Sequence, residues 1–449
     1  MKKEKAITLI SLVITIIILI ILAGIAVNLS LGENGIFRRA RDARDKYLAE
    51  AEKEEQELNE LYKQLGMVDL PENTKENPQE IGTEVALKEG WGTQTVSYTS
   101  TKNGETVKKL TKVATVYAVS VGNGETVPIP KNFYYVGGTL DTGVIISDNI
   151  EDKYDGKTNK TTYEYTRKLK GNQFVWIPCS TSEYTKCNVW NGTTQTNSKL
   201  GTTWWDTTTP KAELSQIEKY GGFYVARYEA GLASDIPEFK TEQTHTKSNQ
   251  IYNKEGKPQS KAGIAPWNFV DWNMSKKNAE SMYNNEYVSS GLITGTQWDV
   301  MLNKMFSKGA ITASDLTNSS EWGNFRNTKL TYTGRLAKAV YIKKWYLPAF
   351  SIEETTEGET TIYNSNNTYG DLLTTGASST TERYHLFDVA GNLWEWTEET
   401  SLYGGNTDTQ YRMFRGGGFV EADSACFRLY DNACTTFLDI GFRIVLYIK

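Results

Sequence analysis

The chain has few of the residues that metal sites and nucleic-acid surfaces require. Only two histidines, His245 and His385, occur in 449 residues, and no two cysteines have the C-x-x-C spacing. A zinc site of the usual kind is therefore not expected. Basic residues (49) do not outnumber acidic residues (54), and the net charge of −5 leaves no excess of cations to neutralise phosphates. We expect no nucleic-acid partner.

Cysteine is also scarce. The four cysteines form two local pairs, Cys179 with Cys187 and Cys426 with Cys434. Outside the cell, each pair could close a disulfide across a short loop. Four buried thiols would fit the same spacing, so the sequence leaves both states open.

Charge is missing from one long segment near the N-terminus. Residues 6–32 carry no charged side chain and are mostly Ile, Leu, Val or Ala, and three of the five residues before them are lysines. At about 1.5 Å per residue, a helix over residues 7–27 reaches across about 30 Å of hydrocarbon. We expect a retained membrane helix with the remainder of the chain outside the cell. The alternative is a cleaved secretory signal, whose apolar core is shorter, about 7–15 residues.

The rest of the chain divides by composition. Residues 1–35 form the leader and membrane segment. Residues 36–66 carry both charge signs with apolar positions spaced near 3.5, which predicts an amphipathic stalk helix. Residues 67–83 hold two prolines and many polar side chains and are expected to form a linker. Residues 84–126, with two Asn-Gly turn signals, predict a small β-rich element, and residues 127–449 predict one domain.

This last domain is expected to be of the α+β class, with loops that outweigh regular structure. One predicted helix begins at the N-cap Ser275, and another follows Thr294, where Gln297 completes a capping box. The second helix should bury one face, made by Trp298, Met301, Leu302 and Met305. Strand-like segments occur at 133–138, 174–178, 222–231 and 441–448.

Six segments in a fixed order carry a resemblance to a known family. They are FVWIP (174–178), GFYVARYEAG (222–231), ITGTQWDVML (293–302), FDVAGNLWEWTEE (387–399), FRGGGF (414–419) and GFRIV (441–445). This series resembles the formylglycine-generating-enzyme family, which implies a C-type-lectin-like fold with little regular structure. Trp394 and Trp396 can anchor irregular loops, and Arg415 and Arg443 can each bind several carbonyls.

The resemblance also implies a calcium site in the loop around residue 391. The carboxylates would come from Asp388 and Glu395, and main-chain carbonyls would come from Gly391 and Leu393. Such hard oxygen ligands suit calcium. The alternative is structural: Asp388 caps a turn and Glu395 pairs with an arginine.

Enzymatic activity is not expected. Catalytic relatives bind copper through two cysteines just after the R-G-G motif, but Glu421 stands at the first of these positions and Cys426 at the second. One thiolate is not the two-sulfur site that Cu(I) favours. Iron-dependent relatives need a histidine cluster, and neither His245 nor His385 sits in one. No Ser/His/Asp arrangement or phosphate loop is visible elsewhere in the sequence. We therefore expect neither copper nor iron, and a copper-dependent oxidase is the alternative.

Noncatalytic proteins of this fold include the variable proteins of diversity-generating retroelements. Their varied ligand-binding residues lie between an R-G-G motif and a G-F-R strand, as residues 419–440 do here. The resemblance implies a surface that binds an extracellular protein or glycan, as in adhesion. The candidate contact residues are Phe419, Asp423, Phe427, Leu429, Tyr430, Asp431, Asn432, Phe437, Leu438 and Asp439.

The N-terminal residues KAITLIS resemble a type IV prepilin leader, which implies cleavage between Ala6 and Ile7. The family has glutamate at the fifth mature position, where this chain has Ser11. The resemblance implies a cell-surface protein anchored in the membrane or associated with pilus subunits. A minor pilin with a purely structural role is a further alternative.

Overall fold

The computed structural model describes part of the chain. The described residues are 81–85, 88, 91, 93–102, 105–185, 189–191, 194–196, 211–236, 252–326, 328–333, 336–340, 349–353, 357–359, 370–400, 411–420 and 424–449. Residues 1–77 and 78–449 form two separate units. The predicted cleavage site, membrane segment and stalk lie outside the described residues. Within the described ranges, no helix is both long and apolar enough to cross a bilayer.

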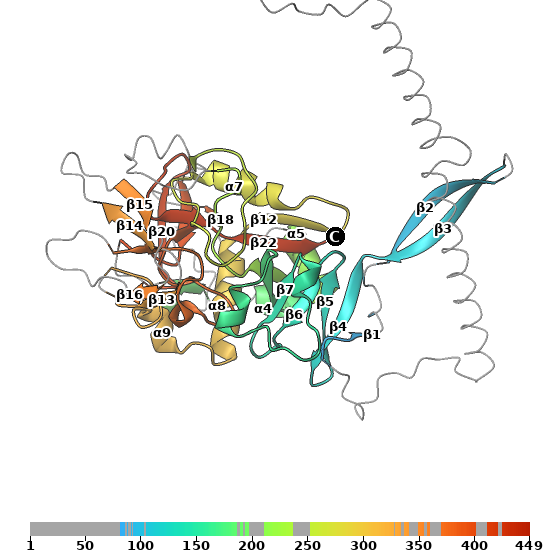
Figure 1. Cartoon of the computed structure of the whole chain (residues 1–449), viewed down its shortest axis with the longest axis horizontal. Coiled ribbons are helices and arrows are strands. Elements are labelled where there is room, and N and C mark those ends of the chain that lie inside the picture. Colours follow the sequence, from blue (N-terminus) through green and yellow to red (C-terminus); the bar gives the residue numbers. More distant parts are fainter. Residues whose placement is uncertain are drawn as a thin grey trace, which may run out of the picture. The chain divides into compact units, whose positions relative to one another are not determined.

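The largest element of the second unit is a six-stranded antiparallel sheet with the strand order β12-β22-β11-β8-β7-β6 (Figure 1). Its strands are β6 (Tyr134–Gly137), β7 (Val144–Ser147), β8 (Gln173–Pro178), β11 (Gly222–Ala226), β12 (Val288–Leu292) and β22 (Ile444–Ile448). The central strands are rows of Val, Ile, Phe, Tyr and Trp without polar alternation, which is typical of a sheet that is covered on both faces.

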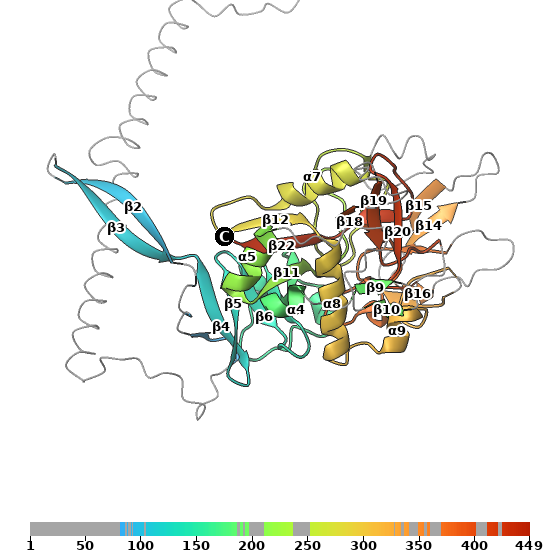
Figure 2. The same ribbon diagram turned by 180° about the vertical axis from the view of Figure 1, so that it is seen from behind.

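Each face of this sheet has its own core. On one face, Val175 and Ile177 of β8 belong to the same apolar cluster as α5 (Lys211–Tyr220) and α8 (Gly295–Ser307). On the other face, Phe174 and Trp176 share a cluster with α7 (Trp272–Met282) and with the hairpin of β4 (Val116–Gly122) and β5 (Glu125–Pro130). The helices therefore cover opposite faces of the sheet, as Figures 1 and 2 show.

A four-stranded sheet in the order β20-β19-β18-β21 carries the carboxy-terminal motifs. It contains β18 (Trp394–Thr400), β19 (Tyr411–Arg415), β20 (Arg428–Asn432) and β21 (Ile440–Phe442). Only the β18–β21 pair is parallel. One residue, Arg443, separates β21 from β22, so the chain passes directly from this sheet into the six-stranded sheet. The predicted single strand over 441–448 is thus divided between two sheets.

The remaining elements are two ten-residue strands that pair with each other and a set of short strands and helices. The other strands are β1 (Glu84–Val85), β2 (Thr93–Lys102), β3 (Glu105–Ala114), β9 (Val189–Asn191), β10 (Thr194–Thr196), β13 (Thr331–Thr333), β14 (Leu336–Val340), β15 (Ala349–Glu353), β16 (Glu357–Glu359) and β17 (Leu372–Leu373). The other helices are α3 (Tyr163–Thr166), α4 (Thr181–Thr185), α9 (Ala313–Thr317) and two 3-10 turns, Ile150–Asp152 and Ser379–Thr381. The mixed α+β class, dominated by sheets, is confirmed.

Several local predictions can be compared with the structure. The capping box is confirmed, since the Gln297 amide donates to the Thr294 hydroxyl at 3.1 Å and the Thr294 amide donates to the Gln297 side chain. The predicted start of α7 at Ser275 is wrong. Asp271 is the N-cap, and Ser275 lies buried inside the helix. Asn123 and Gly124 both have positive φ in the β4–β5 turn, as Asn-Gly hairpins require.

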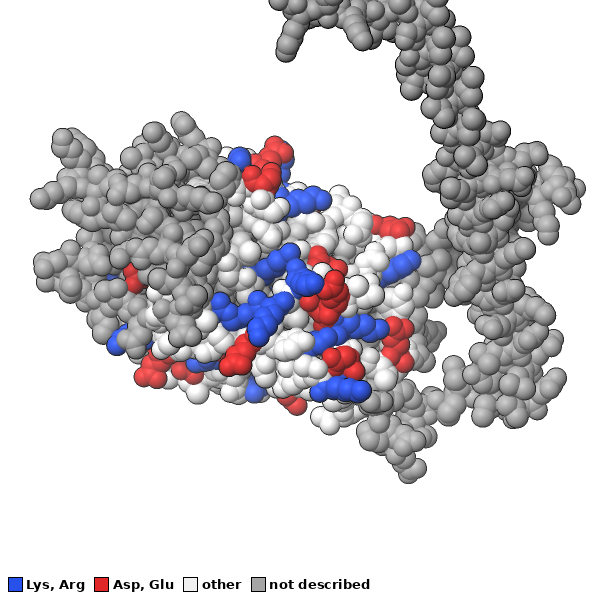
Figure 3. Space-filling view, viewed as in Figure 1, with Lys and Arg blue, Asp and Glu red and all other residues white. Residues whose placement is uncertain are grey.

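The predicted domain boundary at 126/127 falls inside the β4–β5 hairpin. Because Val116 of β4 and Val127 of β5 share a core with Phe174, this hairpin belongs to the domain rather than to a separate element. On the face seen in Figure 3, acidic and basic side chains of the described residues are interspersed, without a wide area of one sign. That face is not built to attract a highly charged polymer over long range.

A buried carboxyl at the start of α5 should make stability depend on pH. Glu213 accepts hydrogen bonds from the hydroxyls of Tyr184 and Thr294, and burial raises its pKa to about 7. A carboxyl with a raised folded-state pKa stabilises the fold below its unfolded pKa near 4.5, and this contribution is lost as pH rises to about 7. The loss is roughly 3 kcal/mol.

The variant Glu213→Gln should therefore flatten the dependence of unfolding free energy on pH between about 4.5 and 7. Urea denaturation at a series of pH values measures this slope. Glu218→Gln, at an exposed site on the same helix, is the control and should keep the slope of the unmodified chain. An unchanged slope in Glu213→Gln would show that this carboxyl ionises normally in the folded state.

Candidate functional site

The described contact residues that the sequence predicts are exposed, half-buried or buried. Leu429 (37% exposed) and Phe437 (38%) face solvent. Asp423 lies outside the described residues. Phe419 and Leu438 are buried in the main core, so their assignment to a contact surface is wrong. The residues with solvent access form what we call the outer surface: Phe427, Leu429, Tyr430, Asp431, Asn432, Phe437 and Asp439.

Packing beneath the outer surface is aromatic. Phe414 of β19 contacts Trp394 and Trp396 edge-on, with ring centroids 5.1 and 5.0 Å away. Phe427 packs against Trp394, and Tyr430 packs edge-on against Tyr411 at 5.8 Å. The predicted anchoring role of the two tryptophans is confirmed, since both are buried and the Trp396 indole N–H donates to the Val270 carbonyl at 3.1 Å.

The segment from Ala433 to Asp439 is held by its main chain. The Ala433 carbonyl accepts from the Trp272 amide (3.1 Å), and the Phe437 carbonyl accepts from the Phe269 amide (2.9 Å). The Asp439 carbonyl accepts from the Trp394 amide (2.7 Å), and the Leu438 carbonyl accepts from the Asn268 side chain. Because these bonds use backbone oxygens, they do not depend on which side chain stands at positions 437 or 439.

Two outer-surface residues shape the turn that follows β20. Asp431 accepts hydrogen bonds from the Asn432 amide (2.6 Å) and the Thr435 hydroxyl (3.0 Å). Asn432 accepts from the Cys434 amide through its side chain (3.0 Å). Side-chain oxygens that bind nearby amides in this way favour turns over strand continuation. These two residues therefore contribute to loop shape as well as to the surface.

A buried tetrad of charges anchors β19 and β20 to the core. It consists of Asp299 of α8, Glu399 of β18, Arg415 of β19 and Arg428 of β20, all at most 2% exposed at their side chains. Arg415 donates to Asp299 at 2.8 Å, and Arg428 bridges Asp299 and Glu399. Two cations thus balance two anions in the described network.

Arg415 also fixes the loop that leads to β20. Its guanidinium donates to the carbonyls of Phe427 (3.2 Å) and Cys426 (3.3 Å), which confirms the predicted binding of several carbonyls. Burial raises the pKa of the Glu399 carboxyl, while the neighbouring arginines oppose that shift. Removing either arginine would leave two buried carboxylates with one cation, so the charges of the tetrad balance only when all four residues are present.

A second buried cluster surrounds Arg443. Its guanidinium makes two parallel bonds to Glu395, at 2.8 and 2.6 Å, and donates to the carbonyls of Ala226 and Phe387. Burial raises the pKa of Glu395 to about 7 and raises that of Glu229 well above its usual value. Glu229 in turn accepts from the Asn392 side chain and the Leu393 amide. Arg443 thereby joins the two sheets at their junction.

The residues predicted to bind calcium lie around this cluster. Asp388 accepts from the Gly376 amide and the Thr381 hydroxyl, both at 2.7 Å, and Glu395 is bound by Arg443. Gly391 and Leu393 are buried beside them, and Gly391 has a φ of 73°. Within the described ranges, no group of three or more His, Cys, Asp or Glu side chains is placed to hold a metal ion. Calcium in this loop stays a prediction.

The position expected for a catalytic thiol is occupied by Cys426, whose side chain is buried. Its sulfur donates to the Leu316 carbonyl at 2.9 Å and lies 3.5 Å from the Ser424 hydroxyl. Burial raises the pKa of this thiol, which disfavours the thiolate that copper requires. Glu421, at the other expected position, lies outside the described residues. The residues present do not fit a two-thiolate copper site.

The two carboxy-terminal cysteines differ in exposure: Cys426 is buried and Cys434 is exposed. Cys434 carries a free, exposed thiol, so it forms no disulfide with Cys426. We expect Cys434→Ser to lower by one the number of thiols that a maleimide labels in the native protein. Cys426→Ser should change that number only after the chain is unfolded. Mass spectrometry of the labelled protein distinguishes these results, and equal effects of both substitutions under native conditions would contradict the described burial.

Four charged residues of these networks were not expected from the sequence: Asp299, Glu399, Arg428 and Glu229. Three of them stand inside segments that were noted for their apolar residues, such as Asp299 directly after Trp298. A charged residue within a stretch that is otherwise expected to be buried usually has a buried partner of opposite charge. That signal was available in the sequence, but the partner of each charge was not.

Comparisons with known proteins match the part of the chain that holds the last three of the six sequence motifs, at 387–399, 414–419 and 441–445. Residues 354–448 match the family model described as the sulfatase-modifying factor enzyme 1-like domain. No curated protein matches the chain. Among solved structures, the chain is similar to one titled "Crystal Structure of CarF", with 13% sequence identity and a TM-score of 0.27 over 59% of this chain and 98% of that chain. The similarity to this family therefore covers residues 354–448 of the chain.

Proposed function

We propose that this protein is a cell-surface, ligand-binding protein of the adhesin type, whose outer surface contacts an extracellular protein or glycan. The observation that carries the proposal is the main-chain attachment of residues 433–439 described above. A loop held by its carbonyls keeps its shape when an exposed side chain such as Phe437 changes to suit a ligand. Binding residues are often found on loops that a rigid scaffold positions in this way.

The composition of the outer surface supports the same function. Leu429 and Phe437 are two of the six large hydrophobic side chains that are exposed among the described residues, and both fall within residues 424–440. Tyr430, Asp431 and Asn432 add aromatic and hydrogen-bonding groups beside them. Adaptable binding surfaces combine these residue types. Many copies on one cell would raise the overall strength of attachment by avidity.

We propose further that residues 419–440 are a diversified region of the retroelement kind. Within this region, exposed side chains such as Leu429 and Phe437 tolerate replacement, which is what diversification requires, whereas Phe419, Arg428 and Leu438 are buried. Sequencing the DNA beside the gene tests this. We expect a reverse-transcriptase gene and an imperfect copy of the final coding segment that differs mainly at adenines. A neighbourhood without either would leave a fixed binding surface.

Anchoring through a prepilin-like segment is part of the proposal. The uncharged run over residues 6–32 supports it. Intact-mass analysis of membrane-extracted protein should show a chain that begins at Ile7, and protease treatment of intact cells should remove the carboxy-terminal domain. A full-length mass would overturn the processing, and complete protection from protease would overturn the surface location.

Two alternative functions predict experimental results that differ from those of a ligand-binding surface protein. A copper-dependent oxidase of the formylglycine-generating type would take up copper and consume oxygen with a cysteine-containing peptide; we expect neither, because the described loop contributes one buried thiol. A structural minor pilin would bind no ligand, and deleting residues 84–449 would then leave attachment of the cells unchanged. We expect that deletion to abolish attachment.

A further inference from the structure

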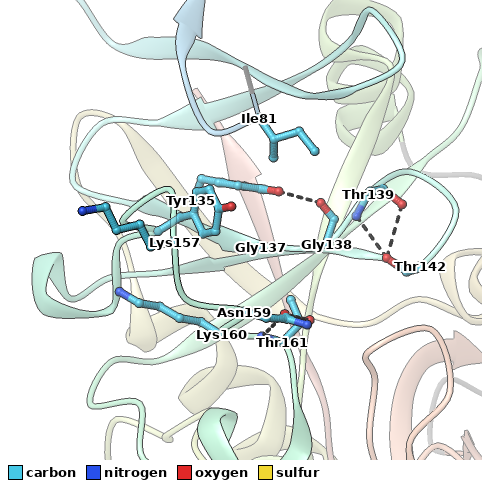
Figure 4. A pocket seen from close by; sticks show the side chains of 11 residues that line it. Ile81, Tyr135, Gly137, Gly138, Thr139, Thr142, Lys157, Asn159, Lys160 and Thr161 are labelled. Atoms are coloured by element: carbon cyan, nitrogen blue, oxygen red, sulfur yellow. Dashed lines mark hydrogen bonds between the residues drawn. The ribbon is translucent and has the colours of Figure 1, made fainter. Parts of the chain in front are cut away.

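A cavity of about 290 Å³ lies on the side of the domain formed by β6 and the loops that follow it, apart from the outer surface. Its walls come from the turn at 138–142 and the loop at 154–161, with Ile81 above them (Figure 4). The volume is at the lower end of the range for small-molecule sites. It therefore suits a ligand about the size of one sugar ring.

Two lysines form one end of this cavity. In Figure 4 the side chains of Lys157 and Lys160 extend toward the same side. The Lys160 side chain is only 6% exposed, and its ammonium donates to the Lys153 carbonyl while the Asp155 carboxylate lies 3.9 Å away. An ammonium has three N–H donors, so the Lys160 ammonium has donors beyond the one that binds the Lys153 carbonyl. The exposed Lys157 adds a second cation. This end thus has a net positive charge and donors that can bind an anion.

Hydroxyl and amide groups form the other end and the floor. The hydroxyls of Thr139 and Thr142 lie 3.3 Å apart in the turn opposite the lysines. The side-chain oxygen of Asn159 accepts two hydrogen bonds from Thr161, one from its main-chain amide (3.1 Å) and one from its hydroxyl (2.5 Å). The Asn159 amide nitrogen keeps its two N–H donors for a ligand, since the oxygen makes both of these bonds.

The remaining wall is apolar and rigid. Tyr135 and Tyr154 pack edge-on with ring centroids 5.7 Å apart, and the Tyr135 hydroxyl donates to the Gly138 carbonyl at 2.7 Å. Both rings line the cavity together with Ile81. A ring with C–H faces packs on such a wall, whereas a strongly hydrated inorganic anion gains nothing from it. The wall therefore favours a cyclic organic ligand.

We propose that this cavity binds a sugar acid in its ring form. Its carboxylate lies at the Lys157 and Lys160 end, its hydroxyl groups are bound by Asn159 and by the Thr139–Thr142 pair, and its ring packs on the tyrosines. The site shares no residue with the outer surface. Binding is noncovalent, and no bond of the ligand is broken.

Isothermal titration calorimetry on the full-length protein in detergent tests the proposal with three probes. Glucuronate should bind at least tenfold more tightly than glucose, which has the same ring without the carboxylate. Gluconate, an open-chain acid, should bind more weakly than glucuronate because it lacks the ring. Equal binding of glucuronate and glucose, or no heat from any of the three, would overturn the proposal.

Variants assign the binding to this cavity. Lys160→Met should weaken glucuronate binding at least tenfold. Because Lys160 also holds the Lys153 carbonyl, the exposed Lys157→Gln is the second variant, and it should weaken binding several-fold without affecting folding. Lys168→Gln, at an exposed site on the same stretch of chain, is the control and should bind as the unmodified protein does. Unchanged affinity in both Lys157→Gln and Lys160→Met would contradict the site.

Discussion

Replacing Arg443 with methionine should lower the free energy of unfolding by about 3–5 kcal/mol, the cost of removing one partner of a buried ion pair. The substitution leaves Glu395 without its two parallel bonds, at 0% exposure, next to the buried carboxyls of Glu229 and Asp388. It also leaves the carbonyls of Ala226 and Phe387 without a donor. Urea or guanidinium denaturation measures the loss.

The pH dependence and a double variant identify the cause. With Arg443 the pKa of Glu395 is already raised to about 7 by burial, and without the arginine it should rise further. The loss of stability should therefore be smaller near pH 5 than near pH 8. Arg443→Met combined with Glu395→Leu should be more stable than Arg443→Met alone, because no unpaired carboxylate remains at that position. A change below about 1 kcal/mol in the single variant would contradict the described cluster.

The second large effect concerns binding. Leu429→Ser together with Phe437→Ser should reduce ligand attachment by at least tenfold, since a few residues that a partner covers carry most of the binding energy of an interface, and both side chains lose large apolar areas that a ligand would cover. Retention of protein-coated beads on immobilised panels of glycans and extracellular proteins measures attachment. The unfolding free energy should change by less than about 1 kcal/mol, because both side chains are exposed.

Matched substitutions elsewhere on the domain separate a specific surface from general hydrophobic adhesion. Ile150 (64% exposed) and Phe306 (43%) are large exposed side chains outside residues 424–440. Ile150→Ser with Phe306→Ser should retain full attachment. If this pair lost binding as strongly as the Leu429–Phe437 pair, the outer surface would have no special role.

Features set by local sequence could be predicted well. The box between Thr294 and Gln297 lies within one helical turn, so its residues identify it without tertiary information. The buried face of α8 followed from its spacing, and Trp298, Met301, Leu302 and Met305 are all buried. The Asn-Gly turn at 123–124 likewise depends only on two adjacent residues.

Features that depend on distant partners could not be predicted. Asp299 meets Arg415 and Arg428 across more than 100 residues of sequence, and no spacing rule connects them. The start of α7 was misplaced because both Asp271 and Ser275 are good caps, and the Asp271 carboxylate meets the Met274 amide at 2.8 Å. Phe419 and Leu438 resemble their exposed neighbours in type, so only the folded structure shows that they are core residues.

The proposed binding role requires that Leu429, Tyr430 and Phe437 of the outer surface can be exchanged, because main-chain bonds hold the backbone beneath them. The most direct measurement compares two libraries of the displayed domain by protease resistance. One library randomises Leu429, Tyr430 and Phe437, and the other randomises Phe414, Phe419 and Leu438. We predict that most members of the first remain folded and that few of the second do. Similar losses in both libraries would contradict the account.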